Sequence, residues 1–154
     1  MRYFLRIFFF ICLVIQPVVT LTCDSSFLEV KHNNNSSQIR VEVADSYGKR
    51  KTGLMFRPHL DRDAGMLFIY DSPQRVEFWM KNTQISLDIA FADQTGRVVR
   101  IIHDTEPLSL ARIDGGENIQ FVLEINAGMA EKLNLFEGSE LVHTSINKNS
   151  TQTC

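Results

Sequence analysis

Short apolar segments separated by turn residues run through most of the chain, and they constrain its fold more than any other feature. Ile39–Val43 and Ile85–Phe91 alternate apolar side chains with polar or small ones, the pattern of a half-buried strand. Met66–Tyr70 is apolar throughout and has the length of a strand, which predicts a fully buried one. About seven such segments at close spacing predict a single all-β domain, a β-sandwich or a barrel.

Two short helices are expected beside the strands. The charged segment 44–52 is typical of a turn followed by a short helix that ends at Gly53. Asn126 is placed to cap a second helix over residues 127–133. Strands and helices do not alternate as in a doubly wound fold, and the sequence contains no glycine-rich phosphate loop, so it gives no motif for nucleotide binding.

The amino terminus has the pattern of a secretory signal peptide. Arg2 and Arg6 precede a short apolar run over residues 7–15, and Pro17 follows it. The run is shorter than the roughly 20 apolar residues that a helix needs to cross a bilayer. We therefore expect residues 1–22 to be removed, leaving an exported protein, periplasmic or secreted, with no stable membrane span. The alternatives are a membrane anchor formed by the uncleaved signal, or lipidation of Cys23.

The remaining chain divides into a flexible leader (23–37), a β domain (38–145) and a polar tail (146–154). Cleavage before Cys23 leaves two cysteines, Cys23 and Cys154, one at each end of the mature chain. Cysteine pairs outside the cytoplasm are usually oxidised. A Cys23–Cys154 disulfide is therefore one prediction, and unpaired or intermolecular thiols in two disordered tails are the other.

The charge balance argues against a nucleic-acid partner. The formal net charge is -2 for the whole chain, and it becomes -4 when Arg2 and Arg6 leave with the signal peptide. Binding to nucleic acid depends on basic side chains that contact phosphates. We therefore expect no nucleic-acid partner.

Polar residues beside or within apolar runs are the candidates for a functional site. They are Arg57, Trp79, Lys81, Asn82, Asp88 and Glu124. Since a buried charge is costly unless it is paired, one interpretation is a structural network that pairs Lys81 or Arg57 with a carboxyl group. A second is a ligand pocket beside Trp79, because aromatic side chains and a few fixed polar groups typically line such sites. A third is a hydrolase in which Asp88 and Glu124 form an acid/base pair.

Metal binding rests on three methionines, Met55, Met66 and Met80, which lie in neighbouring apolar motifs. Thioethers are soft ligands that suit Cu(I). Methionine also fills gaps in apolar cores, so packing is the competing interpretation. The four histidines are scattered without the short spacing of zinc ligands, and we predict no cofactor.

Five motifs carry a resemblance to a known family. In order along the chain they are Gly53–Arg57, Gly65–Phe68, Phe78–Thr83, Leu87–Asp88 and Val122–Gly128. Over about residues 39–144 their order and spacing resemble DUF192, a family of small, mostly exported prokaryotic proteins. The resemblance implies a compact β-sandwich of jelly-roll type behind a signal peptide or lipoprotein signal, and it implies no established activity. The segment 103–116 departs from the family in lacking a cysteine that many members carry there.

These observations together predict an exported single-domain protein of the bacterial envelope that binds a small ligand or serves as an accessory module for an envelope protein. The predicted site is the surface around Trp79, Lys81, Asn82 and Asp88, with Arg57 and Glu124 as neighbours. Hydrolysis by Asp88 and Glu124, and Cu(I) binding by the three methionines, are the alternatives.

Overall fold

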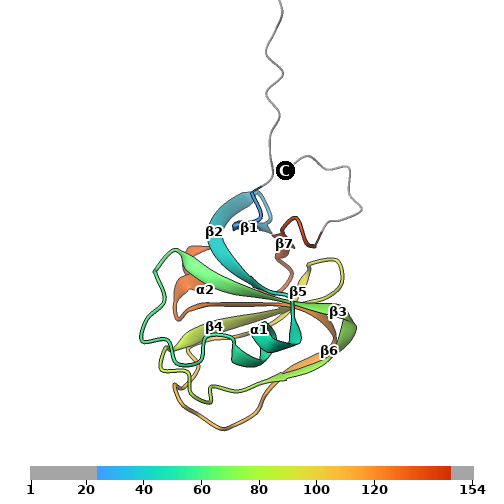
Figure 1. The fold of residues 1–154 in the computed structure, drawn as a ribbon. Coiled ribbons are helices and arrows are strands. Elements are labelled where there is room, and N and C mark those ends of the chain that lie inside the picture. Colours follow the sequence, from blue (N-terminus) through green and yellow to red (C-terminus); the bar gives the residue numbers. More distant parts are fainter. Residues whose placement is uncertain (1–23, 147–154) are drawn as a thin grey trace, which may run out of the picture.

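The computed structural model describes residues 24–146 of the chain (Figure 1). The predicted signal peptide, both ends of the predicted Cys23–Cys154 disulfide and almost all of the predicted tail lie outside the described residues. Within residues 24–146, no helix has the length and apolar character needed to cross a membrane.

Seven strands and two short helices make up the described part of the chain. The strands are β1 (Phe27–His32), β2 (Asn35–Ala44), β3 (Ala64–Phe78), β4 (Leu87–Ala92), β5 (Val98–Ile102), β6 (Ile113–Asn126) and β7 (Glu140–Val142). Helix α1 (Tyr47–Thr52) lies between β2 and β3, and α2 (Met129–Lys132) follows β6. All strands join one sheet in the order β5-β4-β6-β3-β2-β1-β7, in which only the β2–β3 pair is parallel. The predicted all-β single domain with two short helices is confirmed.

The sheet curls until its two ends meet. The amide of Val98, at the start of β5, donates to the carbonyl of Ser139 at 2.8 Å, just before β7. The amide of Leu141 in β7 donates to the carbonyl of Gly96 at 2.8 Å, and Arg97 forms an isolated bridge with Glu140. These contacts connect the two edge strands and give the sheet the form of a short barrel (Figure 1).

The central strands are buried on both faces. Leu67 of β3 and Leu123 of β6 belong to the apolar cluster inside the curl, whereas Phe68 and Val122, one residue away, belong to a second cluster on the other face. Successive side chains of a strand point to opposite faces, so each of these strands contributes to both cores. The second core is completed by Leu54, which follows α1 closely in the chain, and by residues of the loops after β3.

The domain begins earlier than the sequence predicted. Residues 23–37 were expected to form a flexible leader, but they contain β1 and the first part of β2. Leu28 and Val30 lie fully in the core inside the curl, where their burial offsets the polar character of the surrounding sequence. The short polar segment Asn33–Asn34 serves as the turn, with Asn33 in the left-handed region at φ 53°.

Two further boundaries differ from the sequence-based expectation. The turn expected at residues 71–74 lies inside β3, where the pairing with β6 contains register shifts. Helix α2 has Gly128 as its N-cap residue instead of Asn126. The Asn126 side chain donates instead to the carbonyls of Leu60 and Asp61, at 3.1 and 2.9 Å, and so ties β6 to the loop before β3.

Candidate functional site

Strand β6 carries one carboxyl group into an apolar layer. Glu124 lies opposite Met66 of β3 and Ile89 of β4, on the face of the second core. Only 6% of Glu124 is exposed, and within residues 24–146 its carboxyl group forms no hydrogen bond or ion pair with another side chain or backbone group. Burial alone raises the pKa of Glu124 to about 8. The side chain is therefore a neutral acid at neutral pH.

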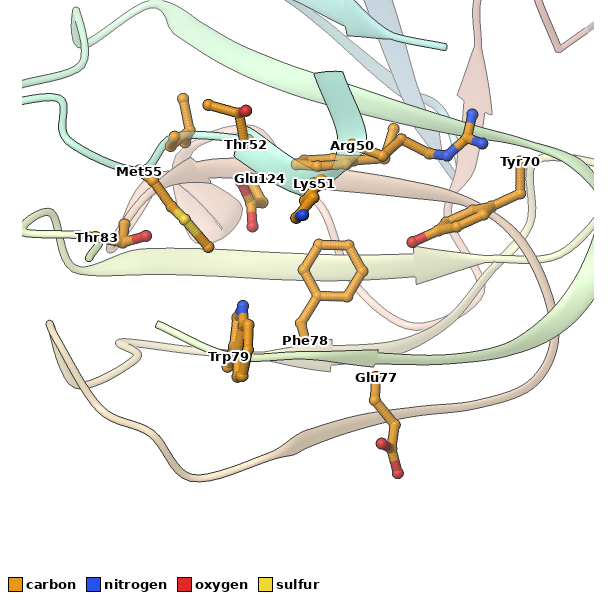
Figure 2. A pocket seen from close by; sticks show the side chains of 13 residues that line it. Arg50, Lys51, Thr52, Met55, Tyr70, Glu77, Phe78, Trp79, Thr83 and Glu124 are labelled. Atoms are coloured by element: carbon orange, nitrogen blue, oxygen red, sulfur yellow. The ribbon is translucent and has the colours of Figure 1, made fainter. Parts of the chain in front are cut away.

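The Glu124 carboxyl group borders a cavity of about 250 Å³. The aromatic side chains of Phe68, Tyr70, Phe78 and Trp79 line it. Figure 2 shows the Tyr70 hydroxyl, the Trp79 indole nitrogen and the Glu124 carboxyl group all directed into the space around the Phe78 ring. Strand β3, the residue that follows it and strand β6 thus bring three polar atoms to one apolar space.

One side of the cavity is closed by the end of α1. Gly53 caps this helix with φ 50° and ψ -133°, a conformation that side chains disfavour. A β-carbon at this position would lie 3.1 Å from the Phe68 ring and 3.9 Å from Glu124 Oε2. The glycine therefore lets the backbone pass close to both residues and keeps the space over Glu124 open.

Two cations of α1 lie at the cavity. The Arg50 guanidinium donates to the carbonyls of Asp45 and Ile69, both at 2.8 Å, and it lies 5.2 Å from the centre of the Tyr70 ring. Lys51 also lines the cavity, and its ammonium lies 6.0 Å from the centre of the Tyr47 ring. Burial raises the pKa of Tyr70, and the nearby Glu124 adds to the rise while Arg50 opposes it.

The Trp79 motif forms the outer wall. Trp79 is half-exposed, and the Lys81 ammonium lies 5.1 Å from the centre of its ring, a cation–π contact. Asn82 has φ 60°, and its carbonyl accepts a hydrogen bond from the Phe56 amide at 2.8 Å. Its contribution is to connect two loops, because Phe56 also has a left-handed backbone, at φ 64°. Such conformations persist where the surrounding structure holds them in place.

Asp88 is buried away from this cavity. In the β4–β6 register Asp88 lies opposite Ile125, whereas Glu124 lies opposite Ile89, so the two carboxyl groups point to opposite faces of the sheet. Asp88 accepts hydrogen bonds at 3.0 Å from the amides of Ala130 and Asp104. It therefore holds the first turn of α2 and the loop after β5. The predicted Asp88/Glu124 acid/base pair is wrong, because the sheet separates its two members.

Arg57 belongs to a different hollow. Its guanidinium pairs with both carboxylate oxygens of Glu42, at 2.6 and 2.8 Å, and this pairing lowers the pKa of Glu42. A hollow of about 470 Å³ borders Arg57 together with His59 and Asp61. Arg57 does not line the Glu124 cavity. The structural network expected between Arg57 or Lys81 and the buried carboxyl groups does not form, since Arg57 pairs with Glu42 and Lys81 stacks on Trp79.

The three methionines have different environments. Met66 and Met80 are buried in the second core, and Met55 lines the Glu124 cavity. Among the described residues, His, Cys, Asp and Glu side chains form no group of three that could hold a metal ion.

The structure therefore brings together two of the six predicted site residues, Trp79 and Glu124, with Lys81 at the outer edge. Sequence reasoning missed Tyr70, Phe78, Arg50 and Lys51. Tyr70 and Phe78 were indistinguishable from core residues in their apolar runs, and Arg50 and Lys51 from an ordinary solvated helix. The one usable signal was Glu124, a lone charge in the apolar segment Phe121–Ile125.

Comparison with known proteins identifies one protein family and two similar solved structures. The model of DUF192, described as an uncharacterized ACR, matches residues 28–143. A solved structure from Sinorhizobium meliloti, provisionally named a transcription regulator, is 33% identical, covers 77% of this chain and 92% of its own, and has a TM-score of 0.74. A Novosphingobium aromaticivorans protein of unknown function is 32% identical, with 75% and 83% covered and a TM-score of 0.72. No curated protein matches the chain.

Proposed function

The chain belongs to the DUF192 family, and from that premise we propose that it is a small-ligand-binding protein whose site is the cavity between α1, Trp79 and Glu124. The observation that carries the proposal is the carboxyl group of Glu124, which lies in an apolar layer, has no partner among residues 24–146 and borders the cavity. Burying a polar group without a hydrogen bond is costly. An apolar side chain at this position would avoid the cost of desolvating an acid, and a carboxyl group at the cavity wall is placed to form a hydrogen bond with a ligand.

The surroundings of Glu124 support binding more than catalysis. Small-molecule sites combine apolar and aromatic walls with a few polar groups that converge on the ligand. Here Phe68 and Phe78 provide the walls, and Tyr70 and Trp79 add polar atoms to the Glu124 carboxyl group. Catalysis by a pair of carboxyl groups requires a second acid in the same cleft. Glu77, the other acid at the cavity, points away and pairs with Arg112.

We place this function outside the cytoplasm. The support is the signal-like amino terminus, with Arg2 and Arg6 before a short apolar run. The name given to the Sinorhizobium meliloti relative raises transcription regulation as another function. The chain has 18 acidic residues against 16 Lys and Arg residues, a balance that does not favour DNA, so we propose no nucleic-acid partner.

The lone tryptophan allows a direct test of binding. Trp79 borders the cavity, so we expect its fluorescence to change saturably when the purified protein is titrated with a member of a fragment library that spans carboxylates, amines, sugars and neutral aromatics. The change should be lost or reduced in Glu124→Leu, a substitution that removes the polar group and keeps the core apolar.

Arg57→Gln is the matched control, because Arg57 lies in the other hollow and should leave the response intact. A library without any saturable binder, read by fluorescence and by ligand-observed NMR, would contradict the proposal. Export is tested separately, by fusing residues 1–30 to a reporter that is active only outside the cytoplasm. A fusion retained inside the cell would overturn the assignment of the compartment.

A further inference from the structure

We propose that the ligand of this cavity is a small organic carboxylate, with its apolar body against Phe68 and Phe78 and its anionic group among the donors of Tyr70, Trp79 and Lys51. The inference rests on the proposed function and adds a chemical class to it. Three observations support it: the balance of hydrogen-bond donors, the charged side chains that line the cavity, and the volume of the cavity.

Donors outnumber acceptors among the polar groups of the cavity. The Trp79 indole and the Lys51 ammonium can only donate, and the Tyr70 hydroxyl can donate. None of the three forms a hydrogen bond to protein within residues 24–146, and Figure 2 shows the Trp79 nitrogen and the Tyr70 hydroxyl directed inward. A neutral Glu124 adds an O–H donor to the same space. The complementary ligand group is rich in acceptors, as a carboxylate is.

The charged side chains that line the cavity favour an anion. Helix α1 contributes Arg50 and Lys51, and Lys81 lies on the outer side of Trp79. Strand β3 contributes two titratable groups, Tyr70 and Glu77, whereas β4 presents Ile89 at the position opposite Glu124. Glu77 is turned away and paired with Arg112. With Glu77 paired, the cations Arg50 and Lys51 outnumber the unpaired anions at the cavity, and this balance attracts an anion and opposes an ammonium ligand.

Volume and wall chemistry set the size of the ligand. The cavity, at about 250 Å³, is smaller than the roughly 300–1,000 Å³ typical of sites for drug-sized molecules. Phe68, Phe78 and the Met55 side chain supply an apolar lining for a body of about one ring. A carboxylate on such a body places its charge toward Lys51 and its apolar part against the rings, as the lining requires.

Glu124 makes this binding sensitive to pH with a definite sign. While the acid is neutral it donates its proton to the ligand carboxylate in a charge-assisted hydrogen bond. Burial raises the pKa of Glu124 to about 8, so above that value the residue becomes an anion that repels the ligand. Affinity for a carboxylate should therefore fall as the pH rises through about 8, and affinity for an amine should rise.

The test compares three probes of the same shape with the purified protein. Phenylacetate, phenethylamine and 2-phenylethanol are titrated by calorimetry at about pH 6.5 and about pH 9, on either side of the Glu124 transition. We expect phenylacetate to bind best at the lower pH. Its affinity should be about tenfold lower at the higher pH, because the neutral fraction of Glu124 falls by about tenfold between the two values. Glu124→Gln, which stays neutral and keeps an N–H donor, should bind phenylacetate with little pH dependence.

Lys51→Gln should weaken phenylacetate binding severalfold and leave 2-phenylethanol binding unchanged, because only the carboxylate uses the charge. Binding of phenethylamine in preference to phenylacetate, or a phenylacetate affinity that falls equally with pH in Glu124→Gln, overturns the carboxylate assignment and leaves the binding function in place. Failure of the whole fragment library, described above, overturns the binding function itself.

Discussion

Two buried carboxyl groups lie on neighbouring strands of this sheet, and they differ in whether the protein supplies hydrogen-bond partners for them. Asp88 of β4 accepts hydrogen bonds from two backbone amides, those of Asp104 and Ala130. Glu124 of β6 has no partner among residues 24–146 and borders a cavity. The two residues are both largely hidden from solvent, at 1% and 6% exposure, so burial alone does not distinguish them.

The difference separates a structural acid from a candidate functional one. Asp88 stabilises the fold because it satisfies amide donors at a helix terminus and in a loop, where unpaired donors would be costly. Glu124 has no hydrogen-bond partner among residues 24–146, and it lowers the free energy of unfolding at any pH where the unfolded chain ionises it. A group that costs the fold stability and faces a cavity is the better candidate for ligand binding.

The largest effect is expected when the structural acid is removed. Asp88→Ala leaves the amides of Ala130 and Asp104 without an acceptor, and each unsatisfied buried donor costs roughly 1–3 kcal/mol. We expect the free energy of unfolding in urea to fall by about 4 kcal/mol. Glu124→Gln at about pH 6.5 is the matched control and should show no loss, because the amide avoids the cost of keeping an acid neutral in the folded protein. Equal losses for the two variants would remove the distinction between the two acids.

The second effect is a pH dependence specific to Glu124. In the unfolded chain this group ionises near its ordinary pKa of 4.5, and in the folded protein near 8. Between these values the folded state binds the extra proton, so the free energy of unfolding falls as the pH rises, by about 1.4 kcal/mol per pH unit from this group. The stabilisation is complete below about pH 4.5 and is lost once the pH passes about 8.

The measurement is the difference between wild type and Glu124→Gln in urea denaturation across this pH range. Taking the difference cancels groups common to both proteins, such as Glu42, whose lowered pKa acts with the opposite sign at lower pH. We expect Glu124→Gln to become the more stable protein as the pH increases, by about 3 kcal/mol in total over the interval from pH 5 to pH 7.5. Parallel curves for the two proteins would contradict the raised pKa of Glu124.

A smaller effect is expected at the backbone that keeps the cavity open. Gly53→Ala introduces a side chain at φ 50° and places its β-carbon 3.1 Å from the Phe68 ring. We expect a loss of about 2 kcal/mol in the free energy of unfolding, together with weaker ligand binding. Gly48→Ala is the control, because its β-carbon would meet nothing within 4 Å and the substitution favours the helix. An unchanged stability of Gly53→Ala would show that the α1 end is free to move.

The smallest effect is expected at Arg57, which the sequence had grouped with the site. Arg57→Gln removes an ion pair with Glu42 that is partly exposed, and such pairs contribute about 0.2–1 kcal/mol. We expect a loss within that range and no change in ligand affinity at the Glu124 cavity. A large drop in ligand affinity in Arg57→Gln would show that the two hollows are coupled, although they are lined by different residues.

Asp88 and Glu124 also show which features of the protein could be predicted from the sequence and which could not. The alternating and continuous apolar segments predicted the strands, and Gly53 predicted the end of α1, because these are properties of local sequence. Asp88 and Glu124 were both recognised as charges beside apolar residues. Their roles depend on the β4–β6 register, which places them on opposite faces and which no local pattern specifies.

The cavity itself depends on residues far apart in the chain. Tyr70 and Phe78 had the pattern of ordinary core aromatics, and only the folding of α1 over β3 and β6 leaves them around an open space. Phe27–His32 was missed as part of the domain for a related reason. Its pairing with β2 and β7, and the burial of Leu28 and Val30, compensate for a polar surrounding sequence.

The measurement that tests the account most directly is the titration of the Glu124 side chain itself. Carbon-13 NMR of the glutamate side-chain carboxyl carbons, with Glu124→Gln used to assign the resonance, follows the ionisation of this one group. The account predicts a midpoint at about 8, and a midpoint that moves upward when phenylacetate is added, because the bound anion favours the neutral acid. A midpoint near the ordinary value of 4.5 would contradict it, since Glu124 would then be ionised and paired or solvated in the folded protein.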